Sequence, residues 1–156
     1  MFCWYLRHMY LQNELCVPGR LTSLGEPLDL RNINVPTYVL NTSEDHIVPW
    51  QAGFASAQAL AGERRFVVGA SGHIAGVINP PIKKKRSFRT GPDVVGLDAD
   101  AWLQRSSEQP GSWWTDWDAW LARHKGPKIR APKAPGGKGY EVIEPAPGRY
   151  VKEKTA

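Results

Sequence analysis

The sequence contains few cysteines and no long hydrophobic run, and these two absences exclude several classes of protein. The chain has 156 residues but only 2 cysteines, Cys3 and Cys16, which cannot form the disulfide framework of a small secreted domain. No apolar segment reaches the roughly 20 residues that a membrane-spanning helix requires, so we expect no transmembrane segment. Arg7 and His8 interrupt the apolar start of the chain, which lacks the pattern of a signal peptide. We expect a cytoplasmic protein with free thiols.

The histidines, cysteines and basic residues do not form a metal-binding or nucleic-acid-binding motif. The 4 histidines and 2 cysteines lack the spacing of metal ligands, so we expect neither a metal nor another cofactor. No aromatic residue lies within the basic run 83–86, and we expect no nucleic acid as a partner. Residues 127–156 contain seven lysines and arginines but three glutamates, so this Pro/Gly-rich tail carries most of the net charge of +5. We therefore divide the chain into a domain, 1–126, and a basic tail, 127–156.

Residues 35–73 have the pattern of a strand, a helix and a second strand. Val35–Asn41 and Phe66–Val68 are apolar, β-favouring runs. The helix between them is predicted to begin near Pro49 and to end at Gly62, as a left-handed cap. A helix of this length between two apolar strands implies parallel pairing of the strands. The expected fold class is α/β, built on a parallel βαβ unit with covering helices.

Two further segments are predicted to be helical. Residues 1–17 have apolar residues for one side of a helix, and a connector with turn residues follows at 20–34. The other helix begins after Ser112 and ends at Gly126. It has helically spaced apolar residues that we expect to cover one face of the sheet as core: Trp113, Trp117, Trp120 and Leu121.

Asp45 and His73 each follow one of the predicted parallel strands. The carboxyl ends of such strands lie at one edge of the sheet, where binding sites form. An acid followed by a histidine is also the second half of a nucleophile–acid–histidine triad in the chain order of α/β-hydrolases. The carboxylate would hold the imidazole in the tautomer that accepts a proton. His46 adjoins Asp45, but neighbouring side chains of an extended segment point apart, so we do not expect His46 to participate directly.

The nucleophile of such a triad is missing from the sequence. There is no Gly-x-Ser-x-Gly or Gly-x-Cys-x-Gly motif, and the nearest match, Gly69–Gly72, is followed by His73 rather than glycine. Neither Cys3 nor Cys16 lies in the strand–turn–helix context that a nucleophile elbow requires. We therefore predict that the chain is the C-terminal part of a larger enzyme.

Several motifs together resemble class I polyhydroxyalkanoate synthases, over nearly the whole chain. A generic hydrolase would share the surroundings of the acid and the histidine, but not the Trp-rich helix or the Pro-Gly-Arg-Tyr-Val segment of the tail. The matching segments are Tyr10-Leu11-Gln12-Asn13-Glu14-Leu15, Asp45-His46-Ile47-Val48-Pro49-Trp50, residues 69–81, Gly111-Ser112-Trp113-Trp114 and residues 144–152.

The resemblance implies the C-terminal part of an α/β-hydrolase fold. It further implies an acyltransferase that polymerises 3-hydroxyacyl-CoA, with 3-hydroxybutyryl-CoA as the expected substrate, into a polyester and releases CoA. By this resemblance, His73 matches the base that activates a cysteine thiol, and Asp45 matches the triad aspartate, for which the family offers a second role in activating the substrate hydroxyl. The cysteine lies outside this chain. The expected partners are the growing polyester chain, a second copy in a homodimer and the surface of polyester granules.

Two other interpretations of the residues remain open. A fragment of an esterase or lipase would share the Asp45 and His73 contexts, and a Gly-x-Ser-x-Gly motif upstream would identify it. A noncatalytic binding or assembly module is the third interpretation. The sequence does not define the preferred acyl-chain length, the role of His46 or the role of the basic tail.

Overall fold

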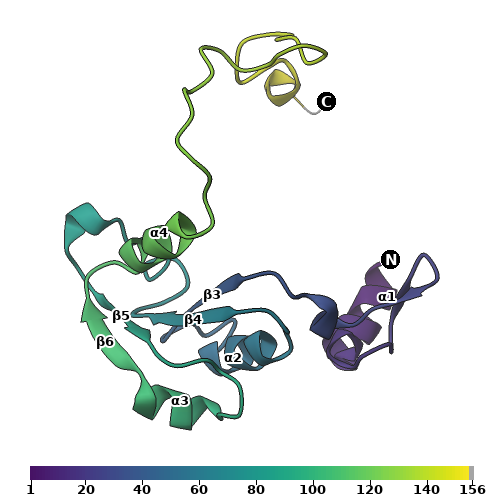
Figure 1. Ribbon diagram of the computed structural model, residues 1–156. Helices are drawn as coiled ribbons and strands as arrows, with labels where there is room; N and C mark the ends of the chain where they lie inside the picture. The colour runs from purple at the N-terminus through teal and green to yellow at the C-terminus, as the bar shows by residue number, and fades with distance from the viewer. Residues whose placement is uncertain (155–156) are drawn as a thin grey trace. The chain divides into compact units, whose positions relative to one another are not determined.

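The computed structural model describes residues 1–154 (Figure 1). The chain divides into two units, Met1–His124 and Lys125–Ala156. The first unit contains a four-stranded sheet in the order β3-β4-β5-β6. Its strands are β3 (Thr37–Thr42), β4 (Arg64–Gly69), β5 (Ser87–Thr90) and β6 (Ser107–Pro110).

The predicted strand–helix–strand unit is present, and its two strands are parallel. β3 and β4 pair in register from Thr37 opposite Arg64 to Thr42 opposite Gly69. The helix α2, Trp50–Gln58, connects them. β5 and β6 extend the sheet beyond β4 by antiparallel pairing. The resulting mixed sheet with helices is compatible with the expected α/β class.

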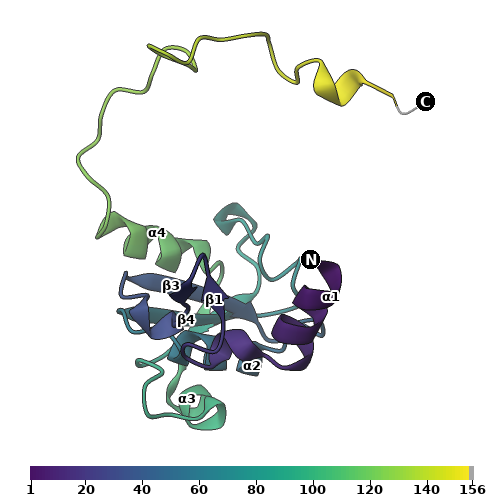
Figure 2. The same ribbon diagram turned by 90° about the vertical axis from the view of Figure 1, so that its right-hand side faces the viewer.

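Helices lie on both faces of this sheet. Figures 1 and 2 show α2 and α3, Ala99–Arg105, on one face and α4, Trp114–Ala122, on the other. α3, β5 and β6 were not predicted from the sequence, because their residues show neither a long helical pattern nor a regular alternation of apolar residues.

The hydrophobic core lies between α2, α3 and β4. Trp102 is fully buried, and its ring lies edge-on to Phe66 with 4.9 Å between the ring centroids. Phe54 also meets Phe66 edge-on, at 5.3 Å. Edge-to-face pairs at such distances stabilise a core beyond the burial of their apolar area. The cluster consists of Trp50, Phe54, Ala57, Phe66, Val68, Val94 and Trp102.

The tryptophans of α4 are less buried than the sequence pattern predicted. No residue of α4 is fully buried, and Trp117 is 40% exposed. The N-cap of α4 is Trp113 rather than the predicted Ser112, although Ser112 Oγ accepts a hydrogen bond from the backbone N–H of Trp114 at 3.1 Å. α4 packs through half-buried rings, with Trp120 edge-on to Tyr38 at 5.6 Å. The tryptophans of the main core are Trp50 and Trp102, which the helical spacing in residues 113–121 did not identify.

Gly62 is not the left-handed cap that the sequence predicted. α2 ends earlier, at Gln58, and φ of Gly62 is not positive. A Cβ atom at Gly62 would lie 2.4 Å from the backbone oxygen of Val35, so glycine is needed there for a close approach of two backbones. The N–H of Gly62 donates to the carbonyl of Ile33 at 3.2 Å in the same approach.

The N-terminal segment is helical from Phe2 to Leu11, whereas a helix was predicted over residues 1–17. The left-handed backbone of Asn13 separates it from a short 3₁₀ turn. Glu14 is buried and joins this segment to the connector, because it accepts hydrogen bonds from Arg20 at 3.1 Å and from Nδ1 of His8 at 2.5 Å. The elements are α1 (Phe2–Tyr5), the π-helix η1 (Leu6–Leu11), the 3₁₀ helices η2 (Glu14–Cys16) and η3 (Leu30–Asn32), and a hairpin of β1 (Thr22–Ser23) and β2 (Glu26–Pro27).

Two short 3₁₀ helices complete the described structure. They are η4, Pro81–Lys83, in the first unit and η5, Tyr150–Lys152, in the second. The second unit also contains an isolated antiparallel bridge between Gly137 and Tyr140. Within residues 1–154, no helix combines the length and the apolar character needed to cross a membrane.

We predict that Trp102→Ala will destabilise the first unit by about 3–5 kcal/mol, the usual cost of truncating a buried tryptophan. The loss would combine the removed apolar contacts with a cavity between α2, α3 and β4. Urea unfolding followed by circular dichroism measures it. Trp117→Ala on α4 is the matched control, with an expected cost of about 1 kcal/mol. Equal losses in the two variants would contradict this placement of the core.

Candidate active site

Asp45 and His73 lie beyond the carboxyl ends of two paired parallel strands. Backbone hydrogen bonds connect the two segments after the strands end. Ser43 N–H donates to the carbonyl of Gly69 at 2.8 Å, and Glu44 N–H donates to the carbonyl of Ser71 at 3.1 Å. The turn that carries the acid is thereby held against the loop that carries the histidine.

The two side chains face each other. Asp45 Oδ1 lies 3.6 Å from His73 Nδ1, and the side chains are 13% and 35% exposed, respectively. His73 Nδ1 is buried and has no hydrogen-bond partner among the described residues. The separation is longer than a hydrogen bond. A shift of well under 1 Å would let Nδ1–H donate to Asp45.

The backbone holds the carboxylate of Asp45 in place and keeps it charged. Oδ1 accepts hydrogen bonds from the N–H groups of Ile47 at 2.9 Å and Val48 at 3.0 Å. The bond from Val48 is the main cause of a pKa below the usual range for aspartate; partial burial opposes it, and Ile47 adds to it. Positive charge on His73 or His46 would lower the pKa of Asp45 further. Asp45 is therefore a carboxylate at neutral pH.

A tight turn fixes the backbone on both sides of His73. Ser71 has a positive φ of 77°, and the N–H of Gly76 closes the turn by donating to the carbonyl of Gly72 at 2.8 Å. A Cβ atom at Gly76 would lie 2.6 Å from both the carbonyl oxygen of Ala70 and Cγ2 of Thr42. Only glycine fits at this position, where the turn crosses the end of β3.

Two indole N–H groups at the start of α4 donate to the same loop. Nε1 of Trp113 lies 3.2 Å from the carbonyl oxygens of Gly76 and of Val77, and Nε1 of Trp114 lies 3.0 Å from that of Val77. The sequence pattern predicted an apolar role for Trp113 and did not reveal these bonds. No signal in the sequence connects residues 113 and 114 with residues 76 and 77.

His46 lies next to His73, contrary to the expectation that its side chain would point away. Their ring centroids are 5.4 Å apart, with 60° between the ring planes. The expectation assumed an extended backbone, but β3 ends at Thr42 and the chain then turns. His46 is exposed and so forms the outer side of the histidine pair.

The two cysteines do not contribute to this arrangement. Both are free and exposed. Cys16 Sγ donates to the side-chain oxygen of Asn13 at 3.2 Å. The residues that the structure describes therefore supply an acid and a base, without a nucleophile in the Gly-x-Cys-x-Gly context that such a site requires.

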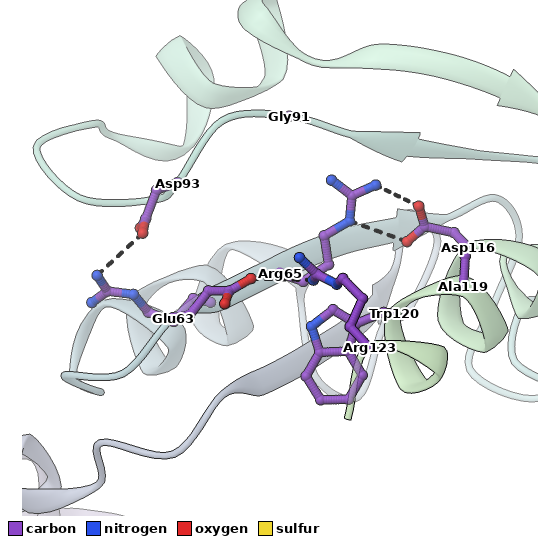
Figure 3. Close-up of a pocket in the computed structure, with 9 residues that line it drawn as sticks. Glu63, Arg65, Gly91, Asp93, Asp116, Ala119, Trp120 and Arg123 are labelled. Carbon is purple, nitrogen blue, oxygen red and sulfur yellow. Dashed lines mark hydrogen bonds and ion pairs between the residues drawn. The ribbon is translucent and has the colours of Figure 1, made fainter. Parts of the chain in front are cut away.

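A pocket of about 410 Å³ is lined by residues that include Arg64 and Arg65 (Figure 3). These residues begin β4, so the pocket lies at the end of the strand opposite to the loop of His73. Asp116 accepts hydrogen bonds from the guanidinium of Arg65 and from Tyr38, and burial raises the pKa of Tyr38 above its usual value. Each arginine that lines the pocket is paired with a carboxylate, so this surface has no excess charge to bind an ion. The pairs are Arg64–Asp93, Arg65–Asp116 and Arg123–Glu63.

No cluster of metal-binding side chains accompanies the acid and the histidine. Among residues 1–154 there is no group of three or more histidine, cysteine, aspartate or glutamate side chains placed to hold a metal ion. The chemistry that the described residues can perform is proton transfer by an imidazole oriented by a carboxylate.

Comparison with known proteins finds relatives named poly(3-hydroxyalkanoate) polymerases. No family model matches it. It is 59% identical over 154 residues to poly(3-hydroxyalkanoate) polymerase subunit PhaC of Cupriavidus necator, covering 99% of this chain and 26% of that protein. The subunit of the same name from Rhizobium etli is 44% identical over 152 residues, covering 97% of this chain and 23% of that protein.

Poly(3-hydroxyalkanoate) polymerase 1 of Ectopseudomonas oleovorans is 38% identical over 149 residues, which cover 96% of this chain and 26% of that protein. The chain thus spans about a quarter of the length of these curated relatives. The similarity extends through both units and includes the loops of Asp45 and His73. The chain is therefore similar, over nearly its whole length, to a segment of poly(3-hydroxyalkanoate) polymerases.

Proposed function

We propose that this chain supplies the acid and the base of an acyltransferase site that polymerises 3-hydroxyacyl-CoA into polyhydroxyalkanoate and releases CoA. The observation that carries the proposal is the placement of Asp45 Oδ1 3.6 Å from the unpartnered Nδ1 of His73, in the turns after two parallel strands. The identity of 59% with a poly(3-hydroxyalkanoate) polymerase supports the choice of reaction. The expected substrate is 3-hydroxybutyryl-CoA.

The described geometry suits a cysteine–histidine–aspartate mechanism. Asp45 accepts the Nδ1–H of His73, which leaves Nε2 free to take the proton of a cysteine thiol. The resulting thiolate forms a bond to the thioester carbonyl carbon, and the bond from that carbon to the sulfur of CoA breaks. The imidazolium returns its proton to the departing CoA thiolate. An acyl group is then attached to the cysteine.

Elongation needs a second proton transfer. The hydroxyl group of a 3-hydroxyacyl unit attacks the acyl–cysteine bond, a new ester forms, and the cysteine sulfur leaves. A base must accept the hydroxyl proton, and both His73 and the carboxylate of Asp45 are candidates. The lowered pKa of Asp45 weakens it as a free base, which favours the route in which it orients His73.

The wider architecture belongs to the same proposal. Parallel β3 and β4, each followed by one triad residue, agree with the last part of an α/β-hydrolase fold. A homodimer, attachment to polyester granules and a cytoplasmic location are expected from the family resemblance alone. An esterase or lipase would use the same acid and base with a serine, but the relatives described above are polymerases.

We predict that the purified chain alone will release no CoA from 3-hydroxybutyryl-CoA, because it contains no positioned thiol. A chimera in which this chain replaces the matching segment of the Cupriavidus necator polymerase should release CoA and form polymer. A thiol-reactive dye and gas chromatography of the polymer measure the two products. Turnover by the chain alone that is lost in Cys3→Ala or Cys16→Ala would overturn the proposal.

In the same chimera, we predict that His73→Ala and Asp45→Asn will each reduce kcat by about 10⁴-fold, as in related triads. The double variant should be little worse than the worse single variant, because the two residues act as one unit. His124→Ala, an exposed histidine of the same unit, serves as the control. Turnover of His73→Ala close to that of the parent chimera would exclude His73 as the base.

A further inference from the structure

The loop that carries His73 has few apolar anchors of its own. The side chains of Ile74 and Ile78 are 65% and 63% exposed, and that of Val77 is also exposed. Burial of apolar side chains therefore contributes little to holding this loop, although the catalytic geometry demands that His73 stay in place. Hydrogen bonds must therefore hold most of this loop in place.

The indole N–H groups of Trp113 and Trp114 supply such hydrogen bonds. Trp113 donates to the carbonyls of Gly76 and Val77, and Trp114 donates to that of Val77, at distances of 3.0–3.2 Å. Residues 73–77 form a turn outside the sheet, so their carbonyls need other partners. The carbonyl of Val77 also accepts a hydrogen bond from the N–H of Asn79 at 3.0 Å, whereas that of Gly76 has Trp113 as its donor among the described residues.

The start of α4 is itself attached firmly to the sheet. Ser112 is buried, and its side-chain oxygen accepts a hydrogen bond from the N–H of Trp114, the first residue of the helix. Asp116, one turn further on, accepts hydrogen bonds from Arg65 of β4 and from Tyr38 of β3. The ring of Trp113 also lies against Tyr38, with 6.2 Å between centroids. The loop is thus fastened to a support that is tied to both parallel strands.

Gly76 links the hydrogen bond of Trp113 to the turn that contains His73. Its carbonyl accepts from Trp113, and its N–H donates to the carbonyl of Gly72, so the two bonds act at the same residue. Its Cα atom is confined between Ala70 and the buried Thr42. His73 lies inside the turn from Gly72 to Gly76, and a displacement of Gly76 would move His73 relative to Asp45.

We propose that Trp113, assisted by Trp114, is a positioning residue that sets the distance between His73 and Asp45 through Gly76. The inference rests on the proposed function for its kinetic consequence, but its geometric content does not depend on it. Trp113 acts through its N–H group. A phenylalanine ring at this position would preserve the contacts with Tyr38 but would leave the carbonyl of Gly76 without its donor.

The test compares Trp113→Phe with Trp117→Phe. Trp117 lies on the same helix, and its ring is tilted by 54° against that of Trp113 with 5.9 Å between centroids. No hydrogen bond of its indole N–H is found within residues 1–154. In the chimera, Trp113→Phe should lower kcat by about 10-fold to 100-fold, the cost of a misplacement on the order of 1 Å. KM should stay near that of the parent, and Trp117→Phe should change neither constant.

Nuclear magnetic resonance of the 156-residue chain gives a readout that does not need turnover. The ring ¹⁵N signals of His73 and the amide signal of Gly76 should shift or broaden in Trp113→Phe and stay in place in Trp117→Phe. The double variant Trp113→Phe/Trp114→Phe should enlarge the effect. Urea unfolding of each variant separates a local displacement from a general loss of stability.

The outcomes distinguish this inference from the proposed function. If Trp113→Phe lowers stability but leaves kcat and the His73 signals unchanged, Trp113 is only a packing residue and the inference is overturned. If His73→Ala is active in the chimera, the proposed function fails, and the positioning role is then decided by the resonance data alone. Shifted His73 signals in Trp113→Phe would support it, and unchanged signals would overturn it.

Discussion

Parallel pairing of β3 with β4 is the constraint on which the candidate site depends. The register sets Thr42 opposite Gly69, so both strands end at the same level and release Asp45 and His73 on one edge. Parallel pairing requires a crossover, and α2 provides it. α2 in turn is held by the aromatic core around Trp102. The 3.6 Å approach of the acid and the base is thus a consequence of the packing beneath α2.

The sequence predicted the elements that carry a strong local signal. The apolar runs within β3 and β4, and the polar residues that follow them, were sufficient to predict the strands and to select Asp45 and His73. β5 and β6 carry no such signal, since Ser87–Thr90 and Ser107–Pro110 are largely polar and become strands only by pairing with β4 and with each other. Gly62 likewise cannot be interpreted from its neighbours in the chain, because the backbone of Val35 makes glycine necessary there.

The tryptophans show why helical periodicity predicted part of the structure but did not reveal the hydrogen bonds that hold the His73 loop. Spacing along a helix indicates which residues share a face, but it does not indicate whether that face meets a sheet, a loop or solvent. Trp113 meets a loop, and its indole N–H finds backbone carbonyls there. Trp102 is fully buried in the core, but its helix, α3, is short and has no clear helical spacing of apolar residues. His46 was misjudged for a related reason, because the backbone turns where the sequence suggested extension.

The open edge of β3 indicates where the nucleophile of the proposed mechanism would be placed. β4 is paired on both sides, whereas within residues 1–154 β3 is paired only with β4. Thr37–Thr42 contains no charged residue, so nothing in its sequence discourages a further strand from pairing there. A strand added in parallel to β3 would end at the same edge as Asp45 and His73. Parallel strands beyond β3 could therefore bring a cysteine to this edge, because the sheet that positions the acid and the base would position the thiol by the same rule.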